Sequence, residues 1–308
     1  MRVALTGAGG FLGRYVLESL HERGIETVLL GRTRPVHNAQ AEFVEVDLLA
    51  KTDFLPLMKS IRATHLVHLA WCTEHGEYKT SPVNQDWVPA TVRLAEAFIL
   101  AGGQGLVAAG SCAEYDWSSG NCSEEHLPRQ SSSPYGAAKA EARSQVTALC
   151  SQGEIPCAWG RIFFPYGTGE DRRRLIPSLI DALQGKRPAF GVQALARRDF
   201  LHASDVASAL LALLYGQAIG TYNLCSGEPT ALADVVRKVA RILHADPQVV
   251  LDLPTRQTEE PILLVGDNRR LRHLGWKPKI TLAEGLYRTI SEMPAAIEDG
   301  KSIKGRPR

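Results

Sequence analysis

Short apolar runs alternate with segments of helical periodicity through the first half of the chain. Strands are predicted where such a run is bounded by glycine or polar residues: Arg2–Thr6, Glu26–Leu30, Phe43–Val46, His65–Ala70 and Leu106–Ala109. Helices are predicted at Phe11–Arg23, which Gly24 ends, and at Val88–Ala101. This alternation is typical of βαβ units, so we expect an α/β fold with a doubly wound parallel sheet.

The second half of the chain has a looser pattern. Helices are predicted at Arg172–Gln184, Thr230–His244 and Leu282–Ile290, a short strand followed by a helix at Phe200–Tyr215, and a strand at Thr221–Leu224. This mixture predicts a smaller mixed C-terminal lobe whose chain returns to the main sheet. The expected units are residues 1–166 with a return segment at about 199–224, a lobe at 167–198 and 225–294, and a flexible basic tail at 295–308.

Composition excludes several classes of function. The 308 residues carry 35 basic and 33 acidic side chains, so no overall positive field favours nucleic acid. The N-terminal segment MRVALTGAGG lacks the apolar stretch of a signal peptide, and no run approaches the roughly 18 apolar residues of a membrane span. The six cysteines are scattered and lack zinc-ligand spacing. We therefore expect a cytoplasmic protein with reduced thiols, no metal site, and no membrane or nucleic-acid partner.

A glycine-rich loop follows the first strand and opens the first helix. Its spacing is G-x-x-G-x-x-G, in the segment Thr6-Gly7-Ala8-Gly9-Gly10-Phe11-Leu12-Gly13. Gly7 permits a tight turn, Gly10 lets the backbone approach a pyrophosphate, and Gly13 lets helix and strand pack closely. The helix N-terminus adds free N–H groups and a positive dipole end. The loop therefore predicts a dinucleotide site.

The end of the second strand bears on the choice of cofactor. NAD-specific folds usually carry an acid there, about 20 residues after the glycines, which binds the ribose 2′-hydroxyl. This chain has Gly31-Arg32-Thr33-Arg34 instead. Because arginine attracts a 2′-phosphate, Arg32 or Arg34 favours NADP(H) over NAD, unless both are solvated loop residues.

A candidate catalytic group follows from two segments. Ser133-Pro134-Tyr135-Gly136-Ala137-Ala138-Lys139 places Tyr135 and Lys139 on one face of a helix start. The lysine ammonium is expected to lower the pKa of the phenol and to hold the nicotinamide ribose. Ser111 ends a strand at the carboxyl edge of the sheet, where ligands bind, and can orient a carbonyl oxygen that Tyr135 protonates.

Further motifs are spread along the chain. They are Ser111 four residues before Tyr115 (S-x-x-x-Y), Trp159–Gly167 (R-x-x-N-x-Y-G), Arg198–His202 with Asp205–Ala207 (R-D-F-V-H-V-x-D-V-A), Tyr222–Leu224 with Ser226–Glu228 (Y-N-x-x-S-G-E) and Leu274–Pro278 (L-G-W-x-P). Through these motifs the chain resembles the extended short-chain dehydrogenase/reductase family, in its nucleotide-sugar epimerase/dehydratase/reductase branch. The resemblance covers nearly the whole length and implies a Rossmann sheet with a lobe that binds a nucleoside-diphosphate sugar.

The resemblance also implies roles for individual residues. The expected cofactor contacts are Gly7, Gly10, Phe11, Leu12, Arg32, Asp47, Leu48, Leu69, Ala70, Tyr135 and Lys139. The expected substrate contacts are Trp71, Ser111, Ala113, Tyr135, Phe190, Arg198 and Arg256, with Arg172 or Arg173 as weaker candidates. Trp71 could equally be a packing residue, and Phe164 stands where relatives often carry a phosphate-binding Asn. Relatives dimerise through two helices, here Val88–Ala101 and Tyr135–Cys150, so a homodimer is expected.

Two positions beside Ser111 separate the reactions of the branch. The resemblance implies that 4,6-dehydratases carry Asp-Glu directly after the catalytic Thr, whereas this chain has Cys112 and Ala113. Reductases of the GDP-fucose synthase type carry a cysteine at the position of Ala113. Cys112 is one residue away, and on an extended segment its side chain would point to the opposite face, so we interpret it as a buried thiol.

Three alternatives remain. The first is NADPH-dependent reduction of the 4-keto group of a nucleoside-diphosphate 4-keto-6-deoxy sugar, the second is NAD-dependent 4-epimerisation, and the third is a non-catalytic NADP sensor. Arg32 favours the reductase, and the presence of both Tyr135 and Lys139 disfavours the sensor. His65, His68 and His202 are interpreted as structural residues.

Overall fold

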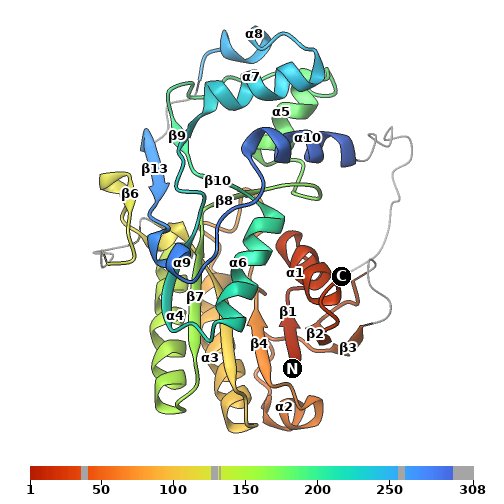
Figure 1. The fold of residues 1–308 in the computed structure, drawn as a ribbon, viewed down its shortest axis with the longest axis vertical. Helices are drawn as coiled ribbons and strands as arrows, with labels where there is room; N and C mark the ends of the chain where they lie inside the picture. Colours follow the sequence, from red (N-terminus) through yellow and green to blue (C-terminus); the bar gives the residue numbers. More distant parts are fainter. Residues whose placement is uncertain (36–40, 126–130, 132, 256–260, 294–308) are drawn as a thin grey trace.

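Parallel strands pair side by side in one main sheet of the computed structural model, which describes residues 1–35, 41–125, 131, 133–255 and 261–293 (Figure 1). In the described part of the chain this sheet has seven strands in the order β11-β7-β5-β4-β1-β2-β3. Their bounds are β1 Arg2–Thr6, β2 Glu26–Gly31, β3 Glu42–Glu45, β4 His65–His68, β5 Gly105–Ser111, β7 Cys157–Ile162 and β11 Gly220–Leu224. The strand order reverses between β1 and β4, which creates a crevice at their carboxyl ends.

Helices cover both faces of this sheet. Alternate residues of β1 point to opposite sides, so Val3 and Leu5 pack with α1 and α6, whereas Ala4 packs with the helices of the other face. The first face is covered by α1 (Phe11–His21) and α6 (Ala203–Tyr215), and the second by α2 (Leu55–Ile61), α3 (Val83–Leu100) and α4 (Pro134–Gln152). The expected doubly wound sheet is confirmed.

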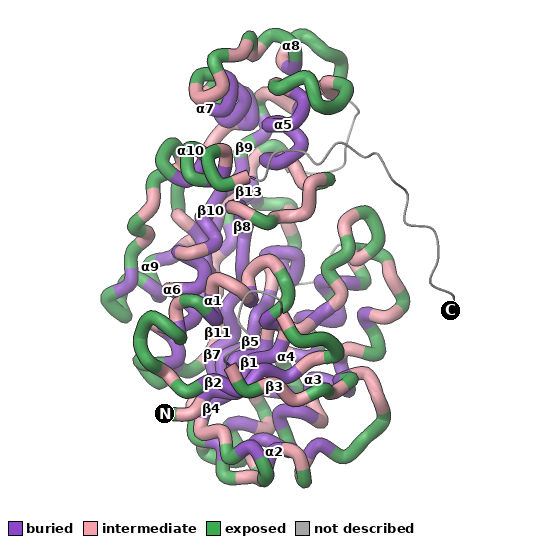
Figure 2. The backbone as a smooth tube through the Cα atoms, turned by 90° about the vertical axis from the view of Figure 1, so that its right-hand side faces the viewer, coloured by how far each residue is buried: buried purple, intermediate pink, exposed green. Residues whose placement is uncertain are grey.

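A smaller mixed lobe stands over the carboxyl edge of the sheet (Figures 1 and 2). Its helices enclose an apolar core of their own and are α5 (Leu175–Leu183), α7 (Leu232–Leu243), α8 (Gln248–Leu251) and α10 (Leu282–Glu292). Short strands join the lobe to the sheet: β8 (Phe164–Tyr166) pairs with β10 (Phe200–His202), and a second group contains β6 (Asn121–Cys122), β9 (Arg197–Arg198), β12 (Thr230–Ala231) and β13 (Leu263–Gly266). Between these strands the chain returns to the main sheet through α6 and β11.

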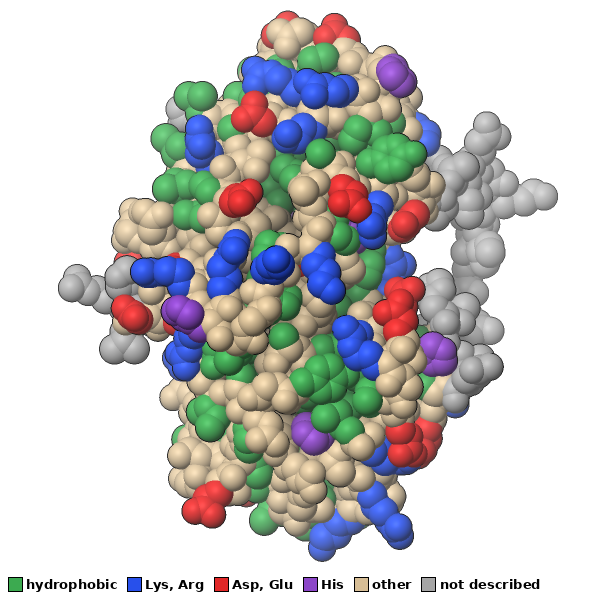
Figure 3. Space-filling model, viewed as in Figure 1, with side chains coloured by type: hydrophobic (Ala, Val, Ile, Leu, Met, Phe, Trp, Pro, Cys, Tyr) green, Lys and Arg blue, Asp and Glu red, His purple; other side chains and the backbone are tan. Residues whose placement is uncertain are grey.

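The remaining short elements complete this frame. They are the 3-10 turns η1 (Cys112–Glu114) and η2 (Trp117–Ser119), and the helix α9 (Arg269–His273), which packs along β11. No helix in the described residues is long and apolar enough to cross a membrane. On the face shown in Figure 3, basic and acidic side chains are interspersed.

Several element boundaries differ from the sequence prediction. The helix expected from Arg172 begins at Leu175, because Asp171 first forms a turn by accepting the Arg173 N–H at 2.9 Å. The helix expected from Val88 begins at Val83, with Pro89 inside it. Helix α7 begins at Leu232, two residues later than predicted, since Thr230 and Ala231 pair with β9.

Candidate active site

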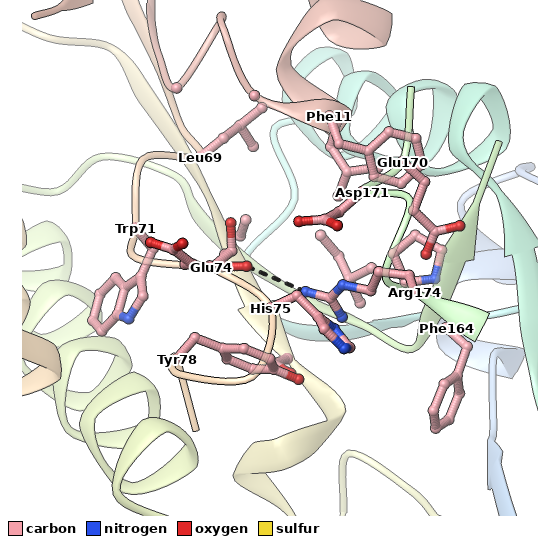
Figure 4. A pocket seen from close by; sticks show the side chains of 18 of the residues that line it. Phe11, Leu69, Trp71, Glu74, His75, Tyr78, Phe164, Glu170, Asp171 and Arg174 are labelled. Carbon is pink, nitrogen blue, oxygen red and sulfur yellow. Dashed lines mark hydrogen bonds between the residues drawn. The ribbon is translucent and has the colours of Figure 1, made fainter. Parts of the chain in front are cut away.

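A cavity of about 1660 Å³ lies between the carboxyl edge of the main sheet and the small lobe. It brings together sixteen of the predicted site residues: Gly7, Gly10, Phe11, Leu12, Arg32, Asp47, Leu48, Leu69, Ala70, Trp71, Ser111, Ala113, Tyr135, Lys139, Phe190 and Arg198. Arg173 also lines the cavity. Arg34 and Arg172 are not among its lining residues, and Arg256 lies outside the described residues. Figure 4 shows part of this wall.

The glycine loop forms a close-fitting cradle. Gly7 has φ 74°, and a Cβ there would come within 2.8 Å of the Ala70 nitrogen. A Cβ on Gly13 would overlap the carbonyl oxygen of Gly7. The first turn of α1 has no acidic residue, and its N-cap, Gly10, makes no side-chain capping bond. Open N–H groups at a positive helix end therefore face the cavity, and this donor set fits the pyrophosphate of a dinucleotide.

The neighbouring end of β4 is held by a buried polar chain. The Thr6 hydroxyl oxygen accepts the N–H groups of Leu69 and Ala70, each at 3.1 Å. It also bonds His68 Nδ1 at 2.8 Å, and the other ring nitrogen bonds Thr91 at 3.1 Å. Burial, with a smaller effect from the Lys139 charge, lowers the pKa of His68 to about 3. A neutral His68 thus fixes the backbone beside the glycine loop.

Ser111, Tyr135 and Lys139 converge on the cavity from two elements. Ser111 is the last residue of β5, and α4 begins at Pro134, where the Ser133 hydroxyl caps the helix by accepting the Gly136 N–H at 3.2 Å. Lys139 Nζ donates to the Ala109 carbonyl at 2.8 Å. Burial lowers the pKa of Lys139 to about 7, against the opposing effect of Glu114. The proton on this lysine is therefore easily lost near neutral pH.

An aromatic wall surrounds Tyr135 and Lys139. Lys139 Nζ lies 3.8 Å from the centroid of the Trp71 ring, and Trp71 in turn stacks on Trp87 at 5.8 Å. Tyr78 meets Tyr135 edge to face at 4.9 Å. Trp71 therefore packs in the core and also lines the cavity, and its contact with the substrate stays a prediction.

The expected lowering of the Tyr135 pKa is wrong for this structure. Burial raises the pKa of Tyr135, Tyr78 adds to the rise, and a hydrogen bond with Ser111 only partly opposes it. Lys139 is not among the largest influences on this pKa, and the same burial destabilises its own ammonium. The phenol is thus held in its protonated form.

Glu114 supports this site and was missed in the sequence analysis. Its carboxylate is fully buried, and it accepts hydrogen bonds from Ser111 N at 2.9 Å, Trp159 Nε1 at 2.8 Å and Arg161 Nε at 2.9 Å. Arg143 approaches it at 3.6 Å. The available signal was a lone charged residue in the apolar stretch from residue 105 to 115. A charge in such a stretch needs a partner, here Arg161 on β7.

Cys112 is buried, but for a different reason from the one predicted. Residues Cys112–Glu114 form a 3-10 turn and not an extended segment, because the Ser111 and Glu114 side chains cap each other's backbone. The Cys112 side chain packs with Tyr115 and Phe163 in an apolar cluster. Burial raises the pKa of its thiol far above neutrality. A thiol in this state is a poor acid or base at pH 7.

The lobe contributes arginines that differ in how strongly they are held. Arg198 is buried and donates to the Pro261 carbonyl at 2.9 Å. Arg173 pairs with Asp171 at 2.7 Å, and Arg172 pairs with Asp181 at 2.8 Å away from the cavity. Phe190 lines the cavity with the Arg187 guanidinium 5.8 Å from its ring. Arg198 and Phe190, with Arg173 as the weaker candidate, therefore remain the candidate substrate contacts in the described part of the lobe.

A Rossmann sheet with a glycine cradle beside Ser111, Tyr135 and Lys139 defines an extended short-chain dehydrogenase/reductase. Residues 3–225 match the model of the NAD dependent epimerase/dehydratase family, and the chain belongs to that family.

Relatives with different activities have similar sequence identity to this chain. GDP-6-deoxy-D-mannose reductase of Pseudomonas aeruginosa is 27% identical over 97% of this chain and 99% of its own length. UDP-glucose 4-epimerase of Mycolicibacterium smegmatis is 27% identical over 94% of this chain and 97% of its own. The solved structure of MoeE5 in complex with UDP-glucuronic acid and NAD is 27% identical, with a TM-score of 0.82 over 94% of this chain and 98% of that one.

Proposed function

We propose that the protein reduces the 4-keto group of a nucleoside-diphosphate 4-keto-6-deoxy sugar with NADPH. The observation that carries this proposal is the exposed Arg32, which lines the cavity at the end of β2 where NAD-specific folds usually carry an acid. In this proposal residues 1–166 with 199–224 bind the dinucleotide, and residues 167–198 and 225–294 bind the nucleotide sugar.

The residues of the cavity have distinct parts in the reaction. The glycine loop and Lys139 hold the cofactor, which when bound supplies the hydride that adds to C4 of the sugar. Tyr135 donates its phenolic proton to the C4 oxygen, and Ser111 donates a hydrogen bond that orients this oxygen. A Tyr135 held protonated by burial suits this role of acid. Arg198 and Arg256 are proposed to bind the diphosphate, and Phe190 is proposed to contact the base.

The residues beside Ser111 support reduction over elimination. Dehydration needs its own acid and base there, and this chain has the buried thiol of Cys112 and the methyl group of Ala113. We further propose a cytoplasmic homodimer that joins through α3 and α4, which pack side by side.

The second candidate is an NAD-dependent 4-epimerase. It is favoured by the likeness to the Mycolicibacterium epimerase and to MoeE5, whose structure contains NAD. An epimerase must first remove a proton from the sugar hydroxyl, so its tyrosine acts as a base in the opening step. Burial raises the pKa of Tyr135, and a protonated phenol fits the proton donor that the reductase needs.

One assay separates the two candidates. Purified protein is mixed with NADPH and a dTDP-, CDP- or GDP-4-keto-6-deoxy sugar, and absorbance at the nicotinamide band is followed. The reductase consumes NADPH in proportion to product. Unchanged NADPH, together with release of stoichiometric NAD from the denatured protein, would establish the epimerase instead.

Two variants test the assigned roles. Tyr135→Phe should lower turnover by roughly 10²–10⁴-fold while NADPH still binds, because only the proton donor is removed. Arg32→Ala should weaken NADPH binding much more than NADH binding, since only NADPH carries the 2′-phosphate. A fully active Tyr135→Phe protein would refute the mechanism, and equal losses for both cofactors in Arg32→Ala would remove the NADPH argument.

A further inference from the structure

Glu170 lines the cavity with a carboxyl group that has no protein partner. Its Oε2 atom is closed to solvent and makes no hydrogen bond within the described residues. The opposite loop presents a second such atom, His75 Nδ1, to the same cavity (Figure 4). A buried carboxylate oxygen without a partner is costly, so this burial favours the neutral carboxylic acid, which can donate a hydrogen bond into the cavity.

The position of Glu170 is fixed by contacts with the first turns of α1. The Tyr15 hydroxyl donates to the Thr168 carbonyl at 3.0 Å. Gly169, with φ 80°, leaves the space that the Arg14 guanidinium fills. Glu170 follows these two residues and lines the same cavity as Phe11 and the glycine cradle.

The charges around Glu170 favour a protonated carboxyl. Burial raises the pKa of Glu170 to about 8, Arg174 opposes the rise and Asp171 adds to it. The Arg173 side chain holds the pKa of Asp171 at about 2, so this neighbour is ionised. Arg174 donates a hydrogen bond to the Thr73 carbonyl at 3.4 Å, and its guanidinium lies over the Tyr78 ring. The other charged or titratable groups around this loop include Arg14 and Tyr15 from α1, Glu74 and His75 from the loop after β4, and Glu292 from α10, which accepts from the Thr168 hydroxyl at 2.8 Å.

We propose that Glu170, as a neutral carboxylic acid, donates a hydrogen bond to the diphosphate of the dinucleotide. An ionised carboxylate at this place would repel a diphosphate, whereas a carboxylic acid donates a short O–H···O⁻ bond to it. The bound diphosphate would in turn hold the proton on Glu170. This inference rests on the proposed seat of the dinucleotide on the glycine loop, but not on the reaction that follows.

The proposal is tested by calorimetric titration of NADPH into wild type, Glu170→Gln and Glu170→Ala between pH 7 and pH 9. Gln keeps a hydrogen-bond donor that does not ionise, whereas Ala removes it. Glu74→Gln is the matched control, because Glu74 lines the same cavity but its side chain is 58% exposed. Any pH dependence that arises from Lys139 or His75 is common to all four proteins.

Between pH 7 and pH 9 the wild type and Glu74→Gln should lose about tenfold more affinity than Glu170→Gln, since only the protonated acid binds. Glu170→Ala should bind several-fold more weakly than Glu170→Gln at pH 7. At pH 8.5, titrations in two buffers of different ionisation enthalpy should show more proton uptake in wild type than in Glu170→Gln. Equal pH dependence in wild type and Glu170→Gln, or full affinity in Glu170→Ala, would overturn the proposal.

A parallel titration with UDP identifies the source of the diphosphate. If the Glu170 variants change UDP binding and leave NADPH binding unaltered, the carboxyl faces the substrate and the proposal is wrong. A wild-type protein that binds no NADPH or NADH would instead contradict the proposed function. A protein that binds NADPH but reduces no keto sugar leaves the Glu170 test valid.

Discussion

Replacing Glu114 with glutamine should destabilise the fold strongly, although the two side chains have the same shape. Glu114 is fully buried and accepts three hydrogen bonds, from Ser111 N, Trp159 Nε1 and Arg161 Nε. Glutamine can keep its carbonyl oxygen toward Ser111 and Trp159, but its amide group then places N–H against the N–H of Arg161. Arg161 is 2% exposed, so its charge would lose its ionised acceptor with no water to replace it, and only the neutral hydroxyl of Tyr115 would remain as a partner.

Breaking a buried ion pair in this way costs about 3–5 kcal/mol, a large part of the 5–15 kcal/mol that holds a typical domain folded. Equilibrium unfolding in urea, followed by circular dichroism, measures the loss as a lower midpoint with an unchanged slope. The control is Glu284→Gln, which breaks the exposed pair of Glu284 and Arg288 and should cost about 0.3–0.5 kcal/mol.

A double variant sharpens the test. In Glu114→Gln/Arg161→Met the unpaired charge is removed, so most of the lost stability should return. If the free energy of unfolding of Glu114→Gln lies within about 1 kcal/mol of the wild-type value, water or Arg143 reaches the site and the reasoning from burial is wrong.

Two further predictions follow from the cradle and from the buried lysine. Gly13→Ala should abolish dinucleotide binding and lower stability by about 1–3 kcal/mol, because the new methyl group overlaps the Gly7 carbonyl. The control is Gly9→Ala, whose methyl group meets no atom within 4 Å and which should retain binding. Equal affinity of the two variants for NADPH would contradict this account. Lys139 should contribute stability to the cofactor-free protein that grows from pH 7 toward pH 10, because the pKa of folded Lys139 is about 7 whereas the unfolded chain keeps that proton up to about pH 10.5. Because Glu170 and the buried cysteines change stability in the opposite direction, this contribution is measured as the difference in urea midpoint between wild type and Lys139→Met, and a difference that does not change with pH would show that Lys139 remains hydrated.

The sequence predicted what depends on local pattern. The strands β1 to β5 are short apolar runs, and the spacing of Tyr135 and Lys139 is a helical repeat, so both could be recognised without knowing the fold. Strand β7 was not predicted, because it carries Trp159 and Arg161 in its interior. Those side chains are tolerated only through Glu114, which is distant in sequence.

Charge states depended on packing in the same way. The Lys139 ammonium was expected to lower the pKa of Tyr135, an argument that considered only the two residues. Trp71 and Tyr78, from the loop after β4, exclude water from both side chains, and the pKa of Tyr135 is therefore raised and not lowered. The two-residue strands β9 and β12 likewise escape prediction, since pairing partners and not residue pattern define them.

The return of the chain to the main sheet through α6 and β11 limits how this scaffold can diversify. The edge strand β11 and the helix that covers it are encoded after part of the small lobe, so the two lobes are not contiguous gene segments. A chimaera that ends this chain near residue 166 and adds only a foreign lobe, without counterparts of α6 and β11, would leave the edge of β7 bare and expose the apolar surface that α6 covers, which invites aggregation. New substrate preferences in such a chain are therefore more accessible through point changes in the cavity loops than through exchange of a whole lobe.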